Sequence, residues 1–352
     1  MTLKEDLKRK ALEYGFVKAG VTTADDFPEY YDPDHIDAYY SFLKNDSRHI
    51  IQNAKSLKAN FPEAKSILSV VYSYGQTKYP EALTKHLGRA YLGRCYGPAP
   101  GSVNGERIRL LKDYIRSKGI RIFDDCFVPD RAAAARAGCI TFGKNNFAYC
   151  GEYGSFIILT NIVMDVDLEP DQPTMVRECP EGCNLCMKAC PTQAIQSPGR
   201  LCPQRCIGFN NWFRQDEKGV DPFIPEDIRP LIGQRFHGCD ICQEVCPRNR
   251  KILSSASVRE PFLEYLAERF DLEQLLFLND EYYEDVVRPI MYNYIKDYRY
   301  FRRNAAIVMG NSGNTKWLPA LERAAKDKDP LVADAANWAI QMLSEKNEKG
   351  EE

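Results

Sequence analysis

Two runs of cysteines decide the fold of this chain: Cys179-Pro-Glu-Gly-Cys183-Asn-Leu-Cys186-Met-Lys-Ala-Cys190-Pro191, and Cys206 followed by Cys239-Asp-Ile-Cys242-Gln-Glu-Val-Cys246-Pro247. In modules that bind two four-iron clusters, the first three cysteines of a run bind one cluster and the cysteine before proline binds the other. The spacing therefore predicts two iron–sulfur clusters. Cluster one would be bound by Cys179, Cys183, Cys186 and Cys246, and cluster two by Cys206, Cys239, Cys242 and Cys190.

The spacing of the cysteines favours a cluster over other uses of thiols. A four-iron cluster needs four soft, anionic ligands, and a short loop supplies three of them only when they are a few residues apart. Zinc sites instead pair two Cys-x2-Cys hooks around one ion, whereas each run here has a three-residue step and ends in Cys-Pro. The remaining cysteines should be inert, small apolar residues; they include Cys126, Cys139, Cys150 and Cys202.

Composition indicates a soluble protein of more than one domain. The chain has 352 residues, with 47 Lys+Arg against 49 Asp+Glu, so its overall charge indicates neither a nucleic acid nor an acidic membrane as partner. Its first ten residues contain no apolar core of a signal peptide, and no stretch approaches the roughly 18 apolar residues of a spanning helix. We expect a cytoplasmic protein without a membrane partner, in which all 13 cysteines stay reduced.

Residues 1–170 are predicted to form an α/β domain. Thr2 and Glu5 form a capping-box pattern at the start of a helix that ends near Gly15. Strand patterns cover residues 66–74, 120–123 and 156–163, and helical patterns cover 104–119 and 132–137.

The rest of the chain divides into three parts. Residues 171–255 have little continuous apolar sequence, so a bacterial-ferredoxin-like double-cluster module here must be organised by its clusters. Residues 256–344 are predicted to be helical, and the helix that begins at Asp329-Pro330 has the alanine-spaced face of a HEAT-like unit. The charged tail, residues 345–352, is predicted to be disordered.

This order of parts resembles the epoxyqueuosine reductase family, cobalamin-dependent iron–sulfur enzymes related to reductive dehalogenases. The resemblance covers nearly every segment, and its motifs include Lys18-Ala-Gly-Val-Thr-Thr-Ala-Asp25, Gly143-Lys144-Asn145, Glu152-Tyr-Gly-Ser155 and Arg205-Cys206-Ile207. It implies that the α/β domain binds cobalamin, that one cluster reduces its cobalt, and that Co(I) converts epoxyqueuosine in tRNA into queuosine.

The resemblance also implies the residues of the cobalamin pocket. Asp124, six residues before Asp130-Arg131, matches the family's proton donor, and Asp125 is adjacent. A carboxyl group donates a proton near neutral pH only when its pKa is raised, and a carboxylate just beyond a strand is where α/β ligands bind. The pocket residues implied beside Asp124 are Cys95, Gly143, Lys144, Asn145, Ala148, Gly154, Ser155 and Leu159. Read from the residues alone, Asp124 and Asp125 could equally begin a turn, and Cys95 could be a buried apolar residue.

Two partners are expected. The family uses its C-terminal helical region for tRNA, which makes Arg299, Arg302 and Arg303 candidates for phosphate contacts, although a solvated helical face is the alternative. An external, low-potential electron donor must supply the reductant. His237, which precedes Gly238-Cys239, either tunes cluster two or is a packed histidine.

Three departures from the family pattern leave alternatives open. The first run begins with Cys179-x3-Cys183, one residue longer than usual, and residues 96–105 and 207–212 differ from the segments of the family that surround the substrate. One alternative is therefore a corrinoid-dependent reductase of a small molecule, like the reductive dehalogenases. The other is a two-cluster electron-transfer protein without cobalamin.

Overall fold

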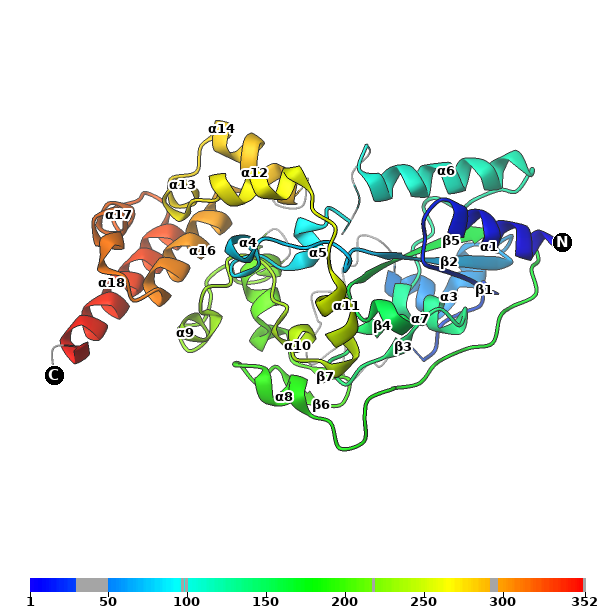
Figure 1. The fold of residues 1–352 in the computed structure, drawn as a ribbon, viewed down its shortest axis with the longest axis horizontal. Helices are drawn as coiled ribbons and strands as arrows, with labels where there is room; N and C mark the ends of the chain where they lie inside the picture. The colour runs from blue at the N-terminus through cyan, green and yellow to red at the C-terminus, as the bar shows by residue number, and fades with distance from the viewer. Residues whose placement is uncertain (30–49, 96–97, 99–100, 217–218, 292–296, 351–352) are drawn as a thin grey trace.

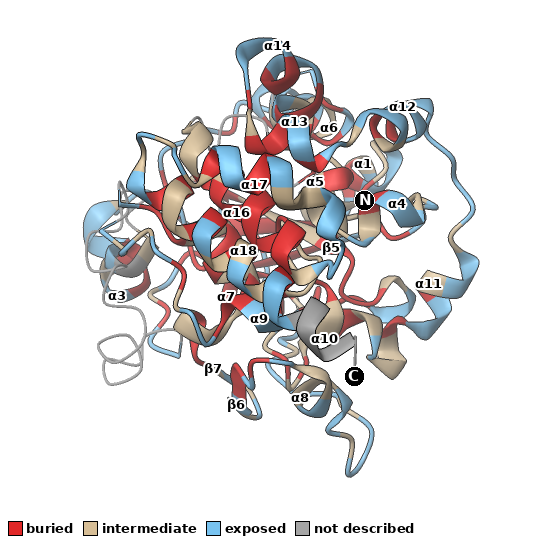
Figure 2. Cartoon of the chain, turned by 90° about the vertical axis from the view of Figure 1, so that its left-hand side faces the viewer, coloured by how far each residue is buried: buried red, intermediate tan, exposed pale blue. Residues whose placement is uncertain are grey.

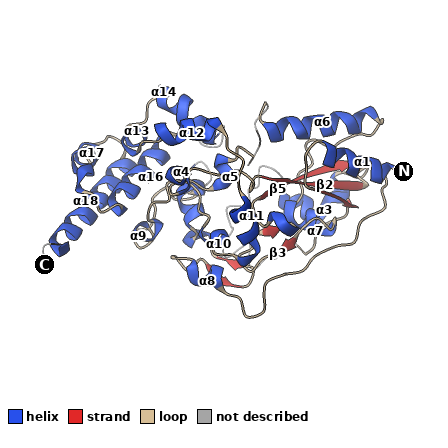
Figure 3. Ribbon diagram, in the orientation of Figure 1, coloured by secondary structure: helices blue, strands red, loops and turns tan. Residues whose placement is uncertain are grey.

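The computed structural model describes residues 1–29, 50–95, 98, 101–216, 219–291 and 297–350 (Figure 1). The N-terminal α/β part and the C-terminal helices lie at opposite ends of the molecule, and the cysteine-rich segment lies between them (Figure 1). Figure 3 shows that the long strands belong to the N-terminal part and that the other end is helical.

The N-terminal sheet has three strands: β1 (Lys18–Thr23), β2 (Ser66–Ser73) and β5 (Ile157–Met164). Their order is β1-β2-β5, and both pairings are antiparallel. Leu68 of the central strand β2 lies opposite Val21 of β1 and opposite Ile162 of β5. Side chains alternate along a strand, so Leu68 and Val70 face one side of the sheet and Ile67 and Val71 the other.

Each face of the sheet is covered by helices. Helices α1 (Leu3–Glu13) and α6 (Val103–Ser117) pack on the face of Leu68, while α3 (Ile50–Asn60) and α7 (Asp130–Arg136) pack on the other. The predicted capping box of α1 is present, because the Thr2 N–H donates to the Glu5 carboxylate and the Glu5 N–H donates to the Thr2 hydroxyl. The smaller elements of this part are α4 (Glu81–Thr84), α5 (Arg89–Leu92), β3 (Thr141–Phe142), β4 (Ala148–Tyr149) and η2 (Gly151–Tyr153).

The strand predicted at residues 120–123 is wrong. Within this segment the structure shows one isolated bridge, between Ile122 and Met164, and the Phe123 N–H donates to the Val163 carbonyl beside it. The rule that ligands bind beyond the carboxyl ends of strands applies to parallel sheets. Because this sheet is antiparallel, that argument for a ligand site at Asp124 fails.

The cysteine-rich segment consists of short elements joined by turns, as its composition predicts. Helix α8 (Leu185–Ala189) lies within the first run and contacts α10 (Ile241–Glu244) of the second. The extra residue of the first run is absorbed by a turn, in which the Cys183 N–H donates to the Pro180 carbonyl at 3.0 Å and Gly182 has a φ of +66°. The other elements are β6 (Ile195–Ser197), β7 (Arg200–Leu201), η3 (Pro203–Arg205), η4 (Phe209–Phe213), α9 (Arg229–Ile232), η6 (Pro247–Asn249) and α11 (Arg250–Ser255).

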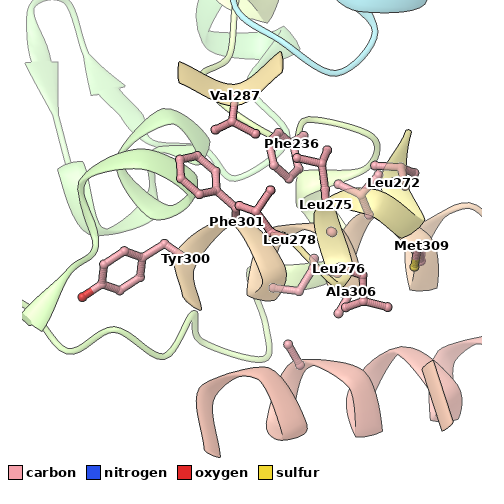
Figure 4. Packing of buried hydrophobic residues seen from close by; sticks show 14 of the residues in the cluster. Phe236, Leu272, Leu275, Leu276, Leu278, Val287, Tyr300, Phe301, Ala306 and Met309 are labelled. Carbon is pink, nitrogen blue, oxygen red and sulfur yellow. The ribbon is translucent and has the colours of Figure 1, made fainter. Parts of the chain in front are cut away.

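The C-terminal part is helical, as predicted, and its core is centred on α16 (Tyr298–Asn311). In Figure 2 α16 is mostly buried, and Figure 4 shows Phe301, Ala306 and Met309 packed with Phe236 and leucines of α13 (Leu272–Leu276). The other elements are α12 (Pro261–Arg269), α14 (Asp280–Tyr282), η7 (Tyr283–Val287), α15 (Arg288–Met291), η8 (Thr315–Trp317), α17 (Leu318–Ala324) and α18 (Pro330–Gly350). Their assignment to HEAT-like repeats stays a prediction.

Helix α18 continues to Gly350, and residues 351–352 lie outside the described chain. The disorder expected of residues 345–352 stays a prediction. Within the described residues, no helix has the length and apolar character needed to cross a bilayer.

Candidate iron–sulfur centre

The four cysteines predicted for cluster one lie around a single pocket. Cys179, Cys183, Cys186 and Cys246 line it together with Lys144, Asn145 and Tyr149. Two donors point at sulfur atoms of this set: the Lys144 N–H is 3.4 Å from Cys179 Sγ, and the Tyr149 hydroxyl is 3.2 Å from Cys246 Sγ. Four thiols surrounded by hydrogen-bond donors are the environment that an anionic iron–sulfur cluster requires.

The cysteines predicted for cluster two form a second set. Burial raises the pKa of Cys206, backbone N–H groups of Phe209 and Gly208 partly offset this rise, and the nearby Cys190 thiol adds to it. Burial also raises the pKa of Cys239 to about 12; the Ile241 backbone N–H partly offsets this rise, and the Cys206 thiol adds to it. Burial, followed by the Cys239 and Cys206 thiols, raises the pKa of Cys242. The structure thus brings Cys190 close to Cys206, while Cys246 joins the first set. Iron must displace these thiol protons when it binds.

The α/β part and the cysteine-rich segment are joined by buried hydrogen bonds. The Ser155 N–H donates to Asn249 Oδ1 and its hydroxyl to Gln243 Oε1, each at 2.8 Å. Asn145 Nδ2 donates to the Cys242 carbonyl at 3.2 Å, and the Lys144 ammonium donates to the Cys183 carbonyl at 2.7 Å. The segments around Asn145 and Ser155 therefore hold the cysteine loops in place.

A buried ion pair also connects the α/β part to the cysteine-rich segment. Arg89 of α5 donates its backbone N–H and its guanidinium to Asp240, which directly follows Cys239. Burial nevertheless raises the pKa of Asp240, because the carboxylate loses water, while Arg89 acts to lower it. No spacing in the sequence indicates this pair, since the two residues are 151 positions apart.

The residues predicted to contact cobalamin are mostly enclosed by protein. Cys95 is fully buried with Tyr74, Phe156 and Ile252, which agrees with the apolar reading of this residue. Ala148 is buried in the hairpin of β3 and β4. Leu159 is half-buried in β5.

The two glycines of that set make room for side chains of this protein. A Cβ atom at Gly143 would lie 2.5 Å from the Tyr149 ring, and one at Gly154 would lie 2.1 Å from Asn249 Oδ1. Asn145 and Ser155 are likewise already engaged, as described above. In this conformation these residues do not fit a corrinoid as direct contacts, so we derive no step through cobalamin.

Asp124 is not close to these residues. It follows Phe123, which bonds to Val163 near the end of β5, whereas Gly154 and Ser155 precede the start of that strand. The eight residues of β5 span about 26 Å. The length of β5 therefore separates the predicted proton donor from Gly154 and Ser155.

The charges around Asp124 lower its pKa, whereas a proton donor near neutral pH needs a raised one. The side chain is 51% exposed and pairs with Lys112 and Arg116 of α6. Partial burial alone would raise its pKa, but the hydrogen bonds and charges of Lys112 and Arg116 outweigh this and lower the pKa. A carboxyl group held this way is ionised near neutral pH and has no proton to donate.

The arginines proposed for RNA phosphates are engaged within the protein. Arg303 is 1% exposed and donates to the backbone carbonyls of Asn210, Arg214 and Pro222, so its predicted phosphate contact is wrong. Arg299 pairs with Asp216, Asp297 and Asp329, and Arg302 pairs with Asp327. The amphipathic pattern of a single helix did not reveal that a neighbouring loop covers Arg303.

The segment 207–212 serves the second cysteine set. Asn211 accepts the Gly238 N–H at 2.9 Å and donates to the Gly238 carbonyl at 3.1 Å, just before Cys239. Asn210 donates to the Cys206 carbonyl at 2.9 Å. His237 is buried with its ring edge-on to Tyr91, which agrees with the packed reading. In the other divergent segment, residues 96–105, residues 96–97 and 99–100 lie outside the described chain, and α6 starts at Val103.

The unpaired cysteines are buried, as expected. Burial raises the pKa of Cys126 and of Cys139 to about 12 in each case, so both stay neutral thiols. Cys150 and Cys202 are buried as well.

Two sets of four thiols in one short segment define an iron–sulfur protein with a double cluster. Residues 178–249 match the family model described as a 4Fe-4S double cluster binding domain. Over 97% of its length the chain is 31% identical to the epoxyqueuosine reductase of Bacillus subtilis, of which it covers 88%. The chain belongs to the epoxyqueuosine reductase family, a family of oxidoreductases.

Solved structures of relatives share the whole fold. An epoxyqueuosine reductase in complex with an epoxyqueuosine-modified stem loop of tRNA-Tyr superposes with a TM-score of 0.78 at 29% identity, covering 99% of this chain and 93% of that one. The Bacillus subtilis enzyme with its catalytic aspartate loop swung out of the active site gives a TM-score of 0.71 at 28% identity, covering 97% of this chain and 99% of that one.

Proposed function

We propose that this protein reduces epoxyqueuosine in tRNA to queuosine. The observation that carries the proposal is the pair of four-cysteine sets, found within a chain that covers 88% of an epoxyqueuosine reductase. An epoxide takes up two electrons and two protons to become an alkene and water. Bound four-iron clusters supply single electrons, and an external low-potential donor must replenish them.

In this proposal the eight cysteines have separate tasks. Cys179, Cys183, Cys186 and Cys246 bind cluster one, and Cys190, Cys206, Cys239 and Cys242 bind cluster two. The crossing of Cys190 and Cys246 ties the two runs together, since each cluster then needs both. The network around Ser155 and Asn145 fixes this unit against the α/β part.

Asp124 is the proposed proton donor to the leaving oxygen. A related enzyme is known with its catalytic aspartate loop swung out of the active site, and here Lys112 and Arg116 hold Asp124 outward. Donation requires Asp124 to leave these cations, because its pKa then returns toward or above the ordinary value.

Cobalamin is the group that the family resemblance implies for the reduction. The residues named for it above are enclosed or engaged, so a corrinoid would require them to move or would bind elsewhere. Cobalt analysis decides this point independently of turnover.

The decisive experiment is anoxic purification followed by iron and cobalt analysis and an assay on tRNA that carries epoxyqueuosine. We expect about eight irons per chain, formation of queuosine with a chemical reductant, and loss of product in the variant Cys246→Ser, which should keep about half of the iron. Replacement of the unpaired Cys202 by Ser is the matched control and should change neither iron nor product. Full iron loading without queuosine, even after cobalamin is added, would refute the proposed substrate.

A further inference from the structure

Tyr149 is a buried side chain that touches the first cysteine set and has no role in the function proposed so far. It is 1% exposed, lines the pocket of Cys179, Cys183 and Cys186, and places its hydroxyl 3.2 Å from Cys246 Sγ. We propose that Tyr149 raises the reduction potential of cluster one by donating a hydrogen bond to the Cys246 sulfur. This inference rests on the proposed function, since it requires a cluster at this site.

The surroundings of the hydroxyl direct its hydrogen toward sulfur. Asn145 Nδ2 donates to the Tyr149 oxygen at 2.9 Å, which occupies an oxygen lone pair. Cys246 Sγ and Asn145 Oδ1, at 3.2 and 3.3 Å, are acceptors for the hydroxyl hydrogen. The Ser155 hydroxyl is also within reach, but it already accepts from Asn249 Nδ2 and donates to Gln243 Oε1. Asn145 Oδ1 already accepts the Phe147 N–H at 3.3 Å, and an anionic thiolate is the stronger acceptor. The favoured arrangement is therefore a hydrogen bond from Tyr149 to Cys246.

The protein holds the Tyr149 ring from several sides. Gly143 provides the space for one ring edge, because a Cβ atom there would lie 2.5 Å from Tyr149 Cε2. The Arg248 guanidinium carbon lies 4.1 Å from the ring centroid, and Arg248 is itself held by the Phe142 and Glu178 carbonyls. A side chain restricted in this way keeps its hydroxyl in one place, so its hydrogen bond acts continuously on the site.

The direction of the effect follows from charge. A cluster becomes more negative when it is reduced, so a hydrogen bond donated to one of its sulfurs stabilises the reduced form more than the oxidised form. Removing the hydroxyl should therefore make cluster one harder to reduce. The Lys144 N–H, 3.4 Å from Cys179 Sγ, acts in the same direction and would remain.

The test is a redox titration of the loaded full-length protein, followed by paramagnetic resonance. Tyr149→Phe removes the hydroxyl and keeps the ring. Tyr153→Phe is the matched control, because it makes the same change four residues along the same segment. The Cys246→Ser variant identifies which signal belongs to cluster one. We expect Tyr149→Phe to keep about eight irons and to lower the midpoint of cluster one by about 59 mV, a tenfold change in a one-electron equilibrium. Cluster two and the control should keep their midpoints.

Each other outcome is decisive. Full iron with an unchanged cluster-one midpoint overturns the inference and leaves the proposed function intact, whereas wild-type protein that binds no iron overturns both. Should Tyr149→Phe fail to hold cluster one, 3-fluorotyrosine placed at residue 149 keeps the ring and the hydroxyl. Its hydroxyl is a stronger donor, so the midpoint should rise at neutral pH, and a midpoint that stays constant or falls would refute the hydrogen bond.

Discussion

Replacing Arg303 by alanine tests whether this residue holds the C-terminal helices in place or contacts RNA. Its guanidinium is buried, and no carboxylate accompanies it in the contacts that the structure shows; it donates to three backbone carbonyls and to Asn304 Oδ1. Burial, together with the charge of Arg214, lowers the pKa of Arg303, which shows that the site is a costly one for a cation. These bonds join α16 to residues 210–222, the segment that follows Cys206.

The size of the effect can be estimated from these contacts. Three buried carbonyls would lose a donor in Arg303→Ala, at about 1–3 kcal/mol each. Relief from burying a cation offsets part of this loss, so we expect a net destabilisation of about 3–5 kcal/mol. Arg303→Lys should recover only part of it, because an ammonium cannot reach the three carbonyls from one planar group.

The assay exploits the positions of the tryptophans. The chain has three: Trp212 lies in the segment that Arg303 bonds to, Trp338 lies in α18, which packs on α16, and Trp317 lies in η8 of the same helical part. Urea unfolding followed by tryptophan fluorescence therefore reports on this region. Arg323→Ala is the control, since that side chain is 63% exposed, and it should shift stability by less than about 0.5 kcal/mol.

RNA affinity measured against salt concentration completes the test. A residue that contacts one phosphate contributes about 0.9 to the slope of log affinity against log salt. Folded Arg303→Ala protein should keep the wild-type slope. An unchanged unfolding midpoint together with a reduced slope would show that Arg303 faces RNA, and the structural reasoning would be refuted.

Two further variants test the other contacts. Gly154→Ala should cost at least about 1–2 kcal/mol, because Gly154 combines a φ of +58° and a ψ of −140° with no space for a methyl group. Gly151→Ala, at φ +46° but with open space, should cost less, and equal unfolding midpoints would argue against the clash. The double variant Lys112→Ala, Arg116→Ala should raise the pKa of Asp124. Because the pKa of Asp124 is lowered in the folded protein, its ion pairs stabilise the fold above the ordinary pKa of an aspartate, and this stabilisation is lost as the pH falls. In urea titrations the variant should therefore lose less stability than wild type between pH 7 and pH 3, by at most about 1 kcal/mol. The same acid sensitivity as wild type would contradict the ion pairs.

The sequence alone predicted those features that depend on residues close together in the chain. The capping box at Thr2 and Glu5 was correct because both partners lie within one helical turn. The extra residue before Cys183 was visible in the spacing of the first run, and a local turn absorbs it. Prediction failed for residues 120–123, because strand formation requires a partner strand along the whole segment and only Ile122 has one.

The cysteine spacing by itself predicted a double cluster, which the family model over residues 178–249 confirms, since short loops leave thiols few alternatives. The exchange of ligands between the two runs is part of the proposed function. The tertiary structure alone decided which charges and donors surround each functional group. It placed Lys112 and Arg116 beside Asp124, buried Arg303 under a loop, and aimed the Tyr149 hydroxyl at Cys246. Hydrogen bonds and charges act through space over a few ångströms, whereas the residues that supply them are often tens of positions apart in the chain.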